Sequence, residues 1–236
     1  MDRNMKNEKD KNIIGPGLVH DAMEMMEEEH SMEEEHSMEE NLAWEEVSRE
    51  HVVRDEWIEI RRSAYRLPDG KVYEPFYTYS RRDFVVIVAT DPQGRYLCVR
   101  QFRQGIREVT TEFPAGGIER KKSVPGKDGG QGGTGHGLDV AEDALEAARR
   151  ELLEETGHES DEWKYLLAVP SNATMADNYA HIFMAANCRR AGDQRLDETE
   201  FLHVRKHSAD ELRELIEKGR FQQAIHILAF LLSRRG

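Results

Sequence analysis

The stretch of sequence that decides the fold runs from residue 141 to residue 157 and reads AEDALEAARRELLEETG. As a helix it gathers four polar side chains on one face, because residues three and four apart are neighbours there: Arg150, Glu151, Glu154 and Glu155. An adjoining face is apolar and must pack against the rest of the protein; it consists of Ala141, Ala144, Leu145, Ala148 and Leu152. We therefore predict a helix that is anchored by one side and presents clustered carboxylates on the other.

Both ends of this helix carry sequence signals. Residues 139–142, Asp-Val-Ala-Glu, match a capping box, so we expect the helix to begin directly after Asp139. Gly157 is typical of the residue that ends a helix, because glycine adopts positive φ without strain.

The three glutamates within five residues repel one another unless a cation shares their site. Carboxylate oxygens suit Mg²⁺, with Mn²⁺ as the second possibility, and both ions bind substrate phosphates alongside a few protein carboxylates. The alternative is a solvated acidic helix end, which is the usual explanation for a pair of adjacent glutamates.

A longer pattern surrounds these glutamates. Glu142 is followed, after seven residues, by Arg-Glu-Leu-Leu-Glu-Glu-Thr-Gly at 150–157. This run resembles the Nudix box, in which Gly, five residues, Glu and seven residues precede Arg-Glu-aliphatic-x-Glu-Glu-x-Gly-aliphatic. His158 stands where the pattern has its last aliphatic residue.

The glycine that opens the box is displaced. The segment Glu112–Glu119, EFPAGGIE, looks like the opening of the box in Nudix enzymes that act on sugar nucleotides, but 25 residues separate Gly116 from Glu142. We interpret residues 121–140, which include seven glycines, as an inserted flexible linker. Their Gly-x-Gly-x-x-Gly spacing does not indicate a dinucleotide-binding turn, because no strand precedes it.

The resemblance is to the ADP-ribose pyrophosphatase-like group, and it implies a metal site. Glu151, Glu154 and Glu155, with the main-chain carbonyl of Ala115, would bind Mg²⁺, and Arg150 would orient the carboxylates. The family fold that it implies is an α/β/α sandwich with a mixed sheet between helices.

Further site residues follow from the same resemblance. The catalytic base would come from a later loop, with Glu198 favoured over Glu200; a glutamate of the box is the other option. Arg103 would bind the substrate phosphates, and a surface salt bridge is its alternative. Trp57 and Phe76 would stack on an adenine, unless they only fill a sheet face.

The implied reaction is hydrolysis of a nucleoside diphosphate sugar, with ADP-ribose giving AMP and ribose 5-phosphate. GDP-mannose or another sugar nucleotide is the alternative substrate. A second class of function is a Nudix scaffold that senses a ligand without catalysis. Loss of carboxylates from the box would favour that class, and here all of them are present.

The remaining secondary structure alternates between strands and helices. We expect strands at 84–89, 95–103, 163–169, 179–186 and 202–204, and helices at 208–219 and 221–234. The run 84–89 is continuously apolar, as in a strand buried on both faces.

Charge and composition divide the chain into three parts. Residues 1–42 contain an acidic repeat and are expected to be a disordered tail, and residues 1–50 carry 16 acidic against 5 basic side chains. Residues 43–82 are expected to form an antiparallel β segment, which the family exchanges across a homodimer. Residues 83–236 would form the Nudix domain. The chain has no basic excess, so we expect no nucleic-acid partner.

Cysteine usage and hydropathy bear on the compartment. Cys98 and Cys188 lie in apolar runs, so each is expected to be a reduced core thiol. No stretch is apolar enough to span a membrane, and the N-terminus lacks the apolar core of a signal peptide. We therefore expect a cytoplasmic protein.

Overall fold

The computed structural model describes residues 42–121 and 140–234. The predicted acidic tail, apart from its last residue, and the predicted linker, apart from its two ends, lie outside the described residues. The described chain forms two compact units, one built from residues 42–50 and 62–76 and the other from residues 51–61, 77–121 and 140–234.

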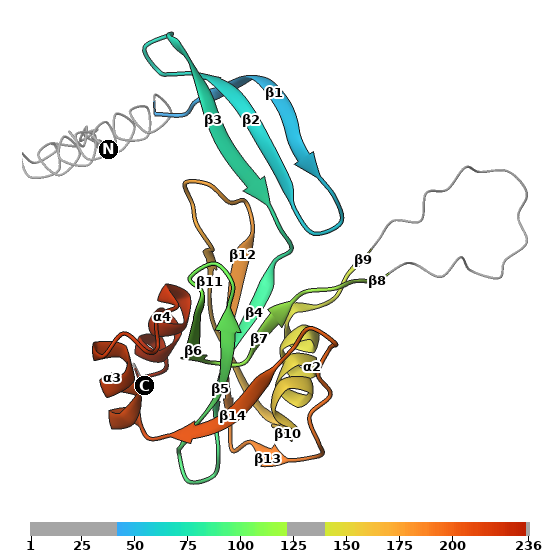
Figure 1. Ribbon diagram of the computed structural model, residues 1–236, viewed down its shortest axis with the longest axis vertical. Coiled ribbons are helices and arrows are strands. Elements are labelled where there is room, and N and C mark those ends of the chain that lie inside the picture. Colours follow the sequence, from blue (N-terminus) through green and yellow to red (C-terminus); the bar gives the residue numbers. More distant parts are fainter. Residues whose placement is uncertain (1–41, 122–139, 235–236) are drawn as a thin grey trace, which may run out of the picture. The chain divides into compact units, whose positions relative to one another are not determined.

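A seven-stranded mixed sheet forms the centre of the larger unit (Figure 1). Its main path is β11-β12-β4-β5-β14, with bounds Glu162–Pro170, Tyr179–Ala186, Phe84–Thr90, Tyr96–Arg103 and Leu202–His207. Strand β6 (Glu108–Glu112) pairs with β5, and β7 (Ala115–Gly117) pairs with β4. The pair β12–β4 is parallel and the other pairs are antiparallel.

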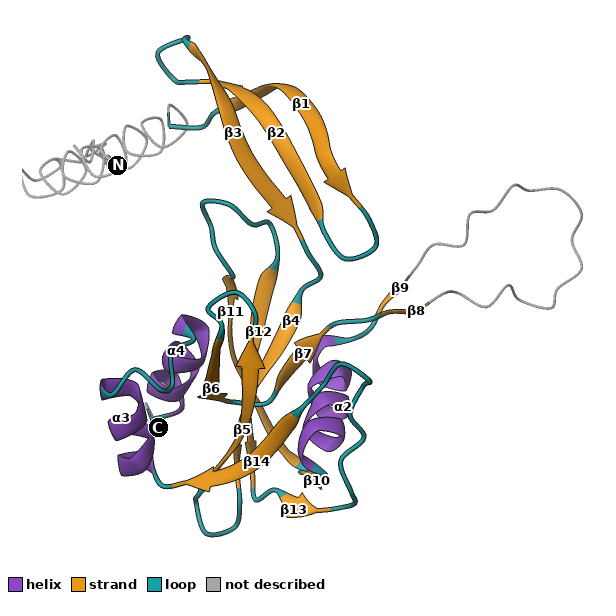
Figure 2. Cartoon of the chain, in the orientation of Figure 1, coloured by secondary structure: helices purple, strands orange, loops and turns teal. Residues whose placement is uncertain are grey.

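Helices cover both faces of this sheet (Figure 2). Helix α2 (Ala144–Thr156) lies on one face, and α3 (Ala209–Glu217) and α4 (Ala224–Ser233) lie on the other. Alternate side chains of β4 divide between the two cores, because successive residues of a strand point to opposite faces. Val85, Ile87 and Ala89 pack with α2, while Val86 and Val88 pack with α3 and α4. The predicted α/β/α sandwich, and burial of the 84–89 strand on both faces, are confirmed.

The predicted start of α2 is wrong. The helix begins at Ala144, and the Asp143 side chain caps it by accepting hydrogen bonds from the backbone N–H groups of Leu145 (2.9 Å) and Glu146 (3.3 Å). Ala141 is not on the helix, because β9 (Val140–Ala141) pairs with β8 (Arg120–Lys121). Two acceptable cap residues lie four positions apart, and this strand pairing decides between them.

The other helix ends follow from local sequence. Ser208 and Glu211 form a capping box at the start of α3. The last helix begins at Ala224 rather than at Phe221, whose ring is buried against Phe113 in the core beneath α3 and α4. Two short strands, β10 (His158–Glu159) and β13 (Arg189–Arg190), pair beyond the C-terminal end of α2.

The N-terminal strands form a three-stranded sheet in the order β1-β2-β3, with bounds Glu45–Arg54, Glu59–Arg66 and Val72–Ser80. Its strands follow one another as hairpins, as predicted for the antiparallel segment (Figure 1). Four aromatic rings pack together on it, with centroids 5.3–6.1 Å apart: Trp44, Tyr65, Tyr73 and Phe76.

Both cysteines are free and buried, which confirms the prediction of core thiols. Burial raises the pKa of both thiols, that of Cys188 to about 11. Within residues 42–121 and 140–234, no helix has the length and apolar character needed to cross a membrane.

Candidate active site

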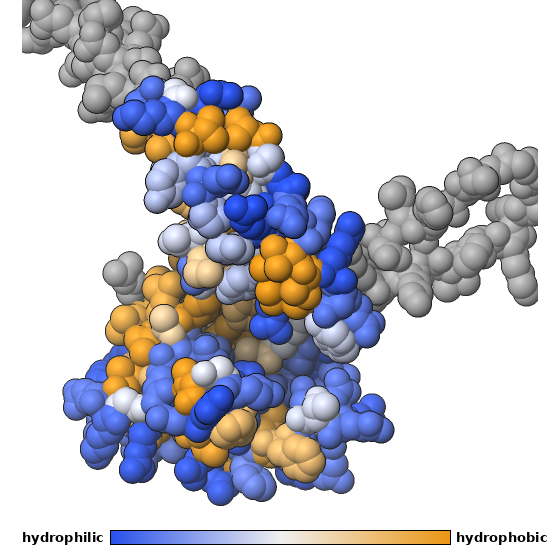
Figure 3. Space-filling view, turned by 45° about the horizontal axis from the view of Figure 1, so that its top comes forward, coloured by the Kyte–Doolittle hydropathy of each residue, from blue (hydrophilic) through white to orange (hydrophobic). Residues whose placement is uncertain are grey.

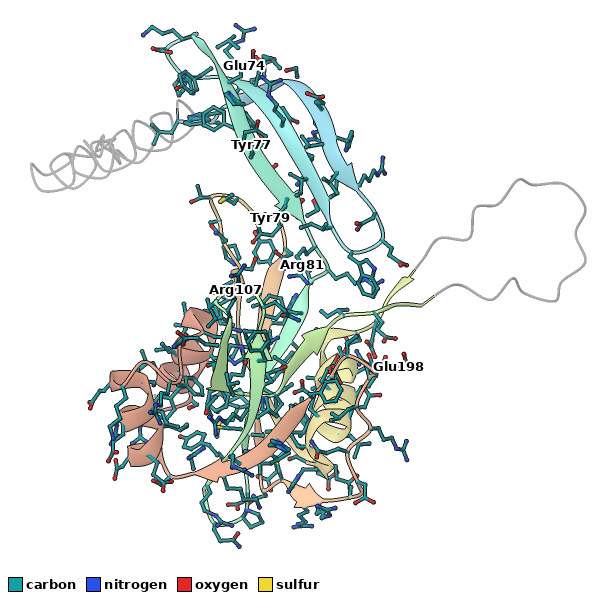
Figure 4. The ribbon with its side chains drawn as sticks, in the orientation of Figure 1. Glu74, Tyr77, Tyr79, Arg81, Arg107 and Glu198 are labelled. Atoms are coloured by element: carbon teal, nitrogen blue, oxygen red, sulfur yellow. The ribbon has the colours of Figure 1, made fainter. Side chains whose placement is uncertain are left out.

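A cleft of about 630 Å³ opens beside β7 and the polar face of α2. Its lining combines carboxylates, arginines and aromatic rings, and includes Trp57, Tyr79, Arg81, Arg82, Arg103, Glu119, Arg150, Glu151, Glu154, Arg195, Asp197 and Glu200. Figure 4 marks Tyr79 and Arg81, which lie at the end of β3 and just after it. The volume is within the ordinary range for a small-molecule site.

The two separated halves of the box meet at this cleft. The backbone N–H of Glu142 donates to the carbonyl of Glu119 (2.8 Å), and the Glu142 carboxylate accepts from the N–H of Glu119 (3.3 Å). The pairing of β8 with β9 continues directly from this contact (Figure 1). The extra residues therefore leave the glycine segment and the helix adjacent, in spite of their separation in sequence.

Arg150 ties the carboxylates of the box together. Its Nη1 donates to Glu151 (2.8 Å) and Glu154 (3.1 Å), and its Nη2 donates to Glu142 (3.1 Å) and to the carbonyl of Gly117 (3.0 Å). These bonds put Arg150 where the resemblance implied, in a position to orient the carboxylates.

Glu151 and Glu155 are buried rather than solvated, with only 7% and 2% of their surfaces exposed. Burial raises the pKa of Glu151 to about 7, although the charge of Arg150 opposes the change. Burial also raises the pKa of Glu155 well above its ordinary value, although Glu155 Oε2 accepts a hydrogen bond from the N–H of Ala115 (3.0 Å). The alternative of a solvated helix end does not describe these two residues.

The donor set fits a hard divalent cation. Within the described part of the chain, no three acidic, histidine or cysteine side chains converge closely enough to hold a metal by themselves. Mg²⁺ does not require three, because it keeps several waters and binds through one or two carboxylates and substrate phosphates. Glu151 and Glu155 offer two carboxylates, and Glu154 is the more exposed third, drawn toward Arg150.

Gly116 explains why this part of the box is glycine. A Cβ atom at this position would overlap the carboxylate of Glu151, whereas a Cβ at Gly117 would meet nothing within 4 Å. The backbone of β7 must therefore approach the helix without a side chain in between.

Arg103 lies in the cleft but also forms an ion pair. Its Nε and Nη2 donate to the two carboxylate oxygens of Glu112 (2.9 and 2.7 Å), and Glu112 is fully buried. Gln223 at the start of α4 donates to the same carboxylate (3.0 Å). Arg103 thus forms a salt bridge, but with a buried carboxylate rather than the surface partner considered as its alternative, and a third of its side chain remains exposed while it lines the cleft.

The two candidate bases occupy different places in the 191–201 loop, which joins β13 to β14. Glu200 lines the cleft and is close enough for its charge to act on Glu151 and Glu155. Glu198 is exposed, does not line the cleft, and lies beside α2 (Figure 4).

The structure also separates the two aromatic candidates. Trp57 lines the cleft and is 69% exposed, so its ring is available to a ligand. Phe76 does not line the cleft and packs among Trp44, Tyr65 and Tyr73, which is the sheet-filling role considered as its alternative.

Three cleft arginines were not predicted: Arg81, Arg82 and Arg195. Within the described residues, no side chain forms an ion pair or hydrogen bond with any of their guanidinium groups. A signal existed for the first two, which lie just before the buried strand β4 and are separated from it by Asp83. The signal for Arg195 was weaker and consisted of its position just before the acidic segment 197–200.

Comparison with known proteins agrees with this geometry. A model of the NUDIX domain matches residues 80–229, more than half of the chain. The chain belongs to the Nudix family. Among relatives of this Nudix protein, the ADP-ribose pyrophosphatase of Bacillus subtilis (strain 168) is 25% identical over 172 residues, 72% of this chain and 82% of that protein. The methanol dehydrogenase activator of Bacillus methanolicus is 22% identical over 190 residues, 78% of this chain and 88% of that protein.

A solved structure described as an ADP compounds hydrolase shares the Nudix fold, with a TM-score of 0.62 and 20% identity over 81% of this chain and 92% of that one. The predicted membership of the Nudix family and the predicted fold are confirmed. The chain is a Nudix hydrolase, similar to an ADP-ribose pyrophosphatase.

The close approach at Gly116 gives a prediction with a matched control. Gly116→Ala displaces the Glu151 carboxylate, and a misplacement on the order of 1 Å costs roughly 100-fold in rate. Gly117→Ala introduces the same methyl group into open space and should leave the rate within about twofold of wild type. The rates of both variants are measured as steady-state hydrolysis of a nucleotide substrate with Mg²⁺. Equal rates for the two variants would contradict the placement of Glu151 in the active site.

The raised pKa values predict how metal and pH act together on stability. An acid with a raised folded pKa costs stability as pH rises from its ordinary value, 4.5, to its folded value, about 7 for Glu151. Without divalent metal, the melting temperature should therefore fall over this range. Mg²⁺ should raise it more at about pH 8 than at about pH 5.5, because the metal binds the ionised carboxylates. Thermal unfolding measures this difference, and Glu151→Gln should reduce it; an equal effect of Mg²⁺ at both pH values would refute the metal assignment.

Proposed function

We propose that this Nudix hydrolase cleaves the pyrophosphate bond of a nucleoside diphosphate sugar, and that its substrate is ADP-ribose, which gives AMP and ribose 5-phosphate. The name of the Bacillus subtilis relative, ADP-ribose pyrophosphatase, supports this choice. The observation that carries the proposal is the buried pair Glu151 and Glu155, of which Glu151 lines an arginine-rich cleft.

Charge complementarity supports a diphosphate ligand. Two carboxylates with raised pKa values are stabilised by a divalent cation, and such a cation brings phosphate oxygens with it. Arg81, Arg82 and Arg195 add guanidinium groups whose forks match phosphate geometry. Trp57 provides an exposed ring at the same cleft for a nucleobase or a sugar.

The metal would be held by Glu151 and Glu155, assisted by Glu154 and the carbonyl of Ala115. When bound, Mg²⁺ neutralises charge on the diphosphate and lowers the pKa of a water molecule. The protein's own contribution is positional: Arg150 holds the carboxylates, and Arg103, fixed by Glu112, presents its guanidinium to the cleft.

Glu200 is the base that the geometry favours. Its carboxylate would accept the proton of the attacking water while the new P–O bond forms and the bridging P–O bond breaks. Glu198, which the sequence favoured, projects from the same loop outside the cleft.

We also propose that residues 43–82 mediate a homodimer. The three-stranded sheet leaves β1 and β3 as its edges and exposes apolar side chains, including Val47, Val52, Val53 and Val72. Hydrophobic residues reach the surface of these strands in Figure 3. Exposed apolar strands of this kind are stabilised by pairing with a second chain.

A substrate panel tests the proposed reaction. The full-length protein with Mg²⁺ is incubated with ADP-ribose, GDP-mannose, UDP-glucose and NAD⁺, and released nucleoside monophosphate is quantified. We expect ADP-ribose to have the highest kcat/KM. A higher value for GDP-mannose would transfer the proposal to that sugar nucleotide, and no hydrolysis of any of them would refute it.

The choice of base is tested by two isosteric substitutions in one loop. Glu200→Gln should lower kcat by roughly 100- to 10,000-fold, the usual contribution of a general base, while Glu198→Gln should change it by less than about threefold. Both variants remove one exposed or half-exposed charge, so each controls for the other. A large loss in Glu198→Gln alone would reverse the assignment.

The dimer is tested by light scattering coupled to gel filtration of the full-length chain. V52K/V53K places two charges on exposed positions of β1 and should convert the dimer to a monomer. Leu231→Lys is the control, because this leucine is 57% exposed on α4. A monomeric wild-type protein, or a dimer that persists in V52K/V53K, would contradict the proposal.

A further inference from the structure

A second hollow, of about 730 Å³, lies near the C-terminal end of α2 and is separate from the catalytic cleft in its lining residues. Two strands bring three cationic side chains to it: Arg189 and Arg190 come from β13, and Lys206 comes from β14. Asp193 is the single carboxylate among its described lining residues, and it pairs with Arg190 (2.6 Å). Lys206 is held by the buried Asp91 (3.1 Å), so its amino group is fixed in place.

His158 gives this hollow its chemical character. It stands where the Nudix box has an aliphatic residue, and it is buried, with 7% of its surface exposed, while still lining the hollow. Its Nδ1 lies 2.8 Å from the carbonyl of Thr156, which can only accept, so Nδ1 carries the proton. Its Nε2 has no hydrogen-bond partner among the described residues and retains a lone pair. A leucine would fill this position without leaving a polar atom unpaired.

Burial and the neighbouring positive charges favour the neutral imidazole. Burial lowers the pKa of His158 and the charges of Lys206 and Arg190 lower it further, whereas the hydrogen bond to the Thr156 carbonyl and the charge of Asp91 raise it. The hollow therefore combines several hydrogen-bond donors of positive charge with a neutral acceptor, Nε2 of His158. A fully deprotonated anion would satisfy the donors but leave Nε2 without a hydrogen.

We propose that this hollow binds a phosphate group that still carries a proton, either free or as the end of a phosphate monoester. Its unprotonated oxygens accept from Arg189, Arg190 and Lys206, and its P–O–H donates to Nε2 of His158. A phosphate ion occupies a small part of about 730 Å³, which leaves room for the organic part of a monoester. This inference does not depend on the substrate of the catalytic cleft.

Titration calorimetry on the full-length protein tests the proposal with inorganic phosphate and with sulfate, at about pH 6.5, where phosphate retains a proton. Sulfate has the same shape but no hydrogen to donate. We expect one binding event at which phosphate binds at least about tenfold more tightly than sulfate. Equal affinity for the two ions at this event, or no phosphate binding, would overturn the proposal.

Variants assign the event to the hollow. R189Q/R190Q should abolish it, while R205Q/R213Q, which removes the same charge from exposed positions on β14 and α3, should retain it. Phosphate that binds in the catalytic cleft would persist in both variants. An event that survives in R189Q/R190Q would refute the assignment.

His158→Leu isolates the acceptor. It installs the aliphatic residue of the box pattern, and thermal unfolding verifies that the protein is folded. We expect the preference for phosphate over sulfate to disappear, and its retention in folded protein would contradict the role of Nε2. Titrations with AMP and ribose 5-phosphate then distinguish the sources, because a monoester site binds one of them more tightly than inorganic phosphate and a free-ion site does not.

Discussion

The burial of two glutamates between α2 and β7 is the constraint on which the site depends. Glu151 and Glu155 would favour water, yet the apolar face of α2 is committed to the core through Ala147, Ala148 and Leu152. The helix therefore cannot rotate to release its acids. Their cost is offset by Arg150 and by the N–H of Ala115, and the raised pKa values indicate that the offset is incomplete. A divalent cation bound beside these carboxylates, as proposed, would remove this residual cost.

The 191–201 loop shows how the catalytic helix and the candidate base are held in one frame. The last carbonyls of a helix have no partners within it. Here the backbone N–H groups of Ala191 and Arg195 donate to the backbone carbonyls of Gly157 (2.8 Å) and Glu154 (2.9 Å). The side-chain Nε2 of Gln194 donates to the backbone carbonyl of Glu155 (2.6 Å). The loop thus satisfies the helix end with its first half and presents Glu200 with its second half. Gly157 permits the contact, since a Cβ there would strike the carbonyl of Gly192.

The sequence predicted those features that local pattern determines. The continuous apolar run at 84–89 identified the central strand, because a strand buried on both faces is apolar at every position. The helical spacing of apolar and acidic residues around 150–157 identified the helix. The helix start was misjudged because Asp139 and Asp143 are equally good caps in isolation, and only the pairing of β8 with β9 separates them. Glu198 and Glu200 likewise lie two positions apart in one acidic segment, and only the folded structure shows that Glu200 lines the cleft while Glu198 does not. Arg195 reaches the cleft through backbone bonds to α2, which no sequence pattern encodes.

The junction between β8 and β9 has a consequence for how such sequences evolve. The contacts of Glu119 with Glu142, at the base of the paired strands β8 and β9, hold the two halves of the box together although 25 residues separate Gly116 from Glu142. The fixed spacing in the motif is then a property of a short connection and not a requirement of catalysis. A connection of another length could therefore join β8 to β9 without moving Glu119 away from Glu142.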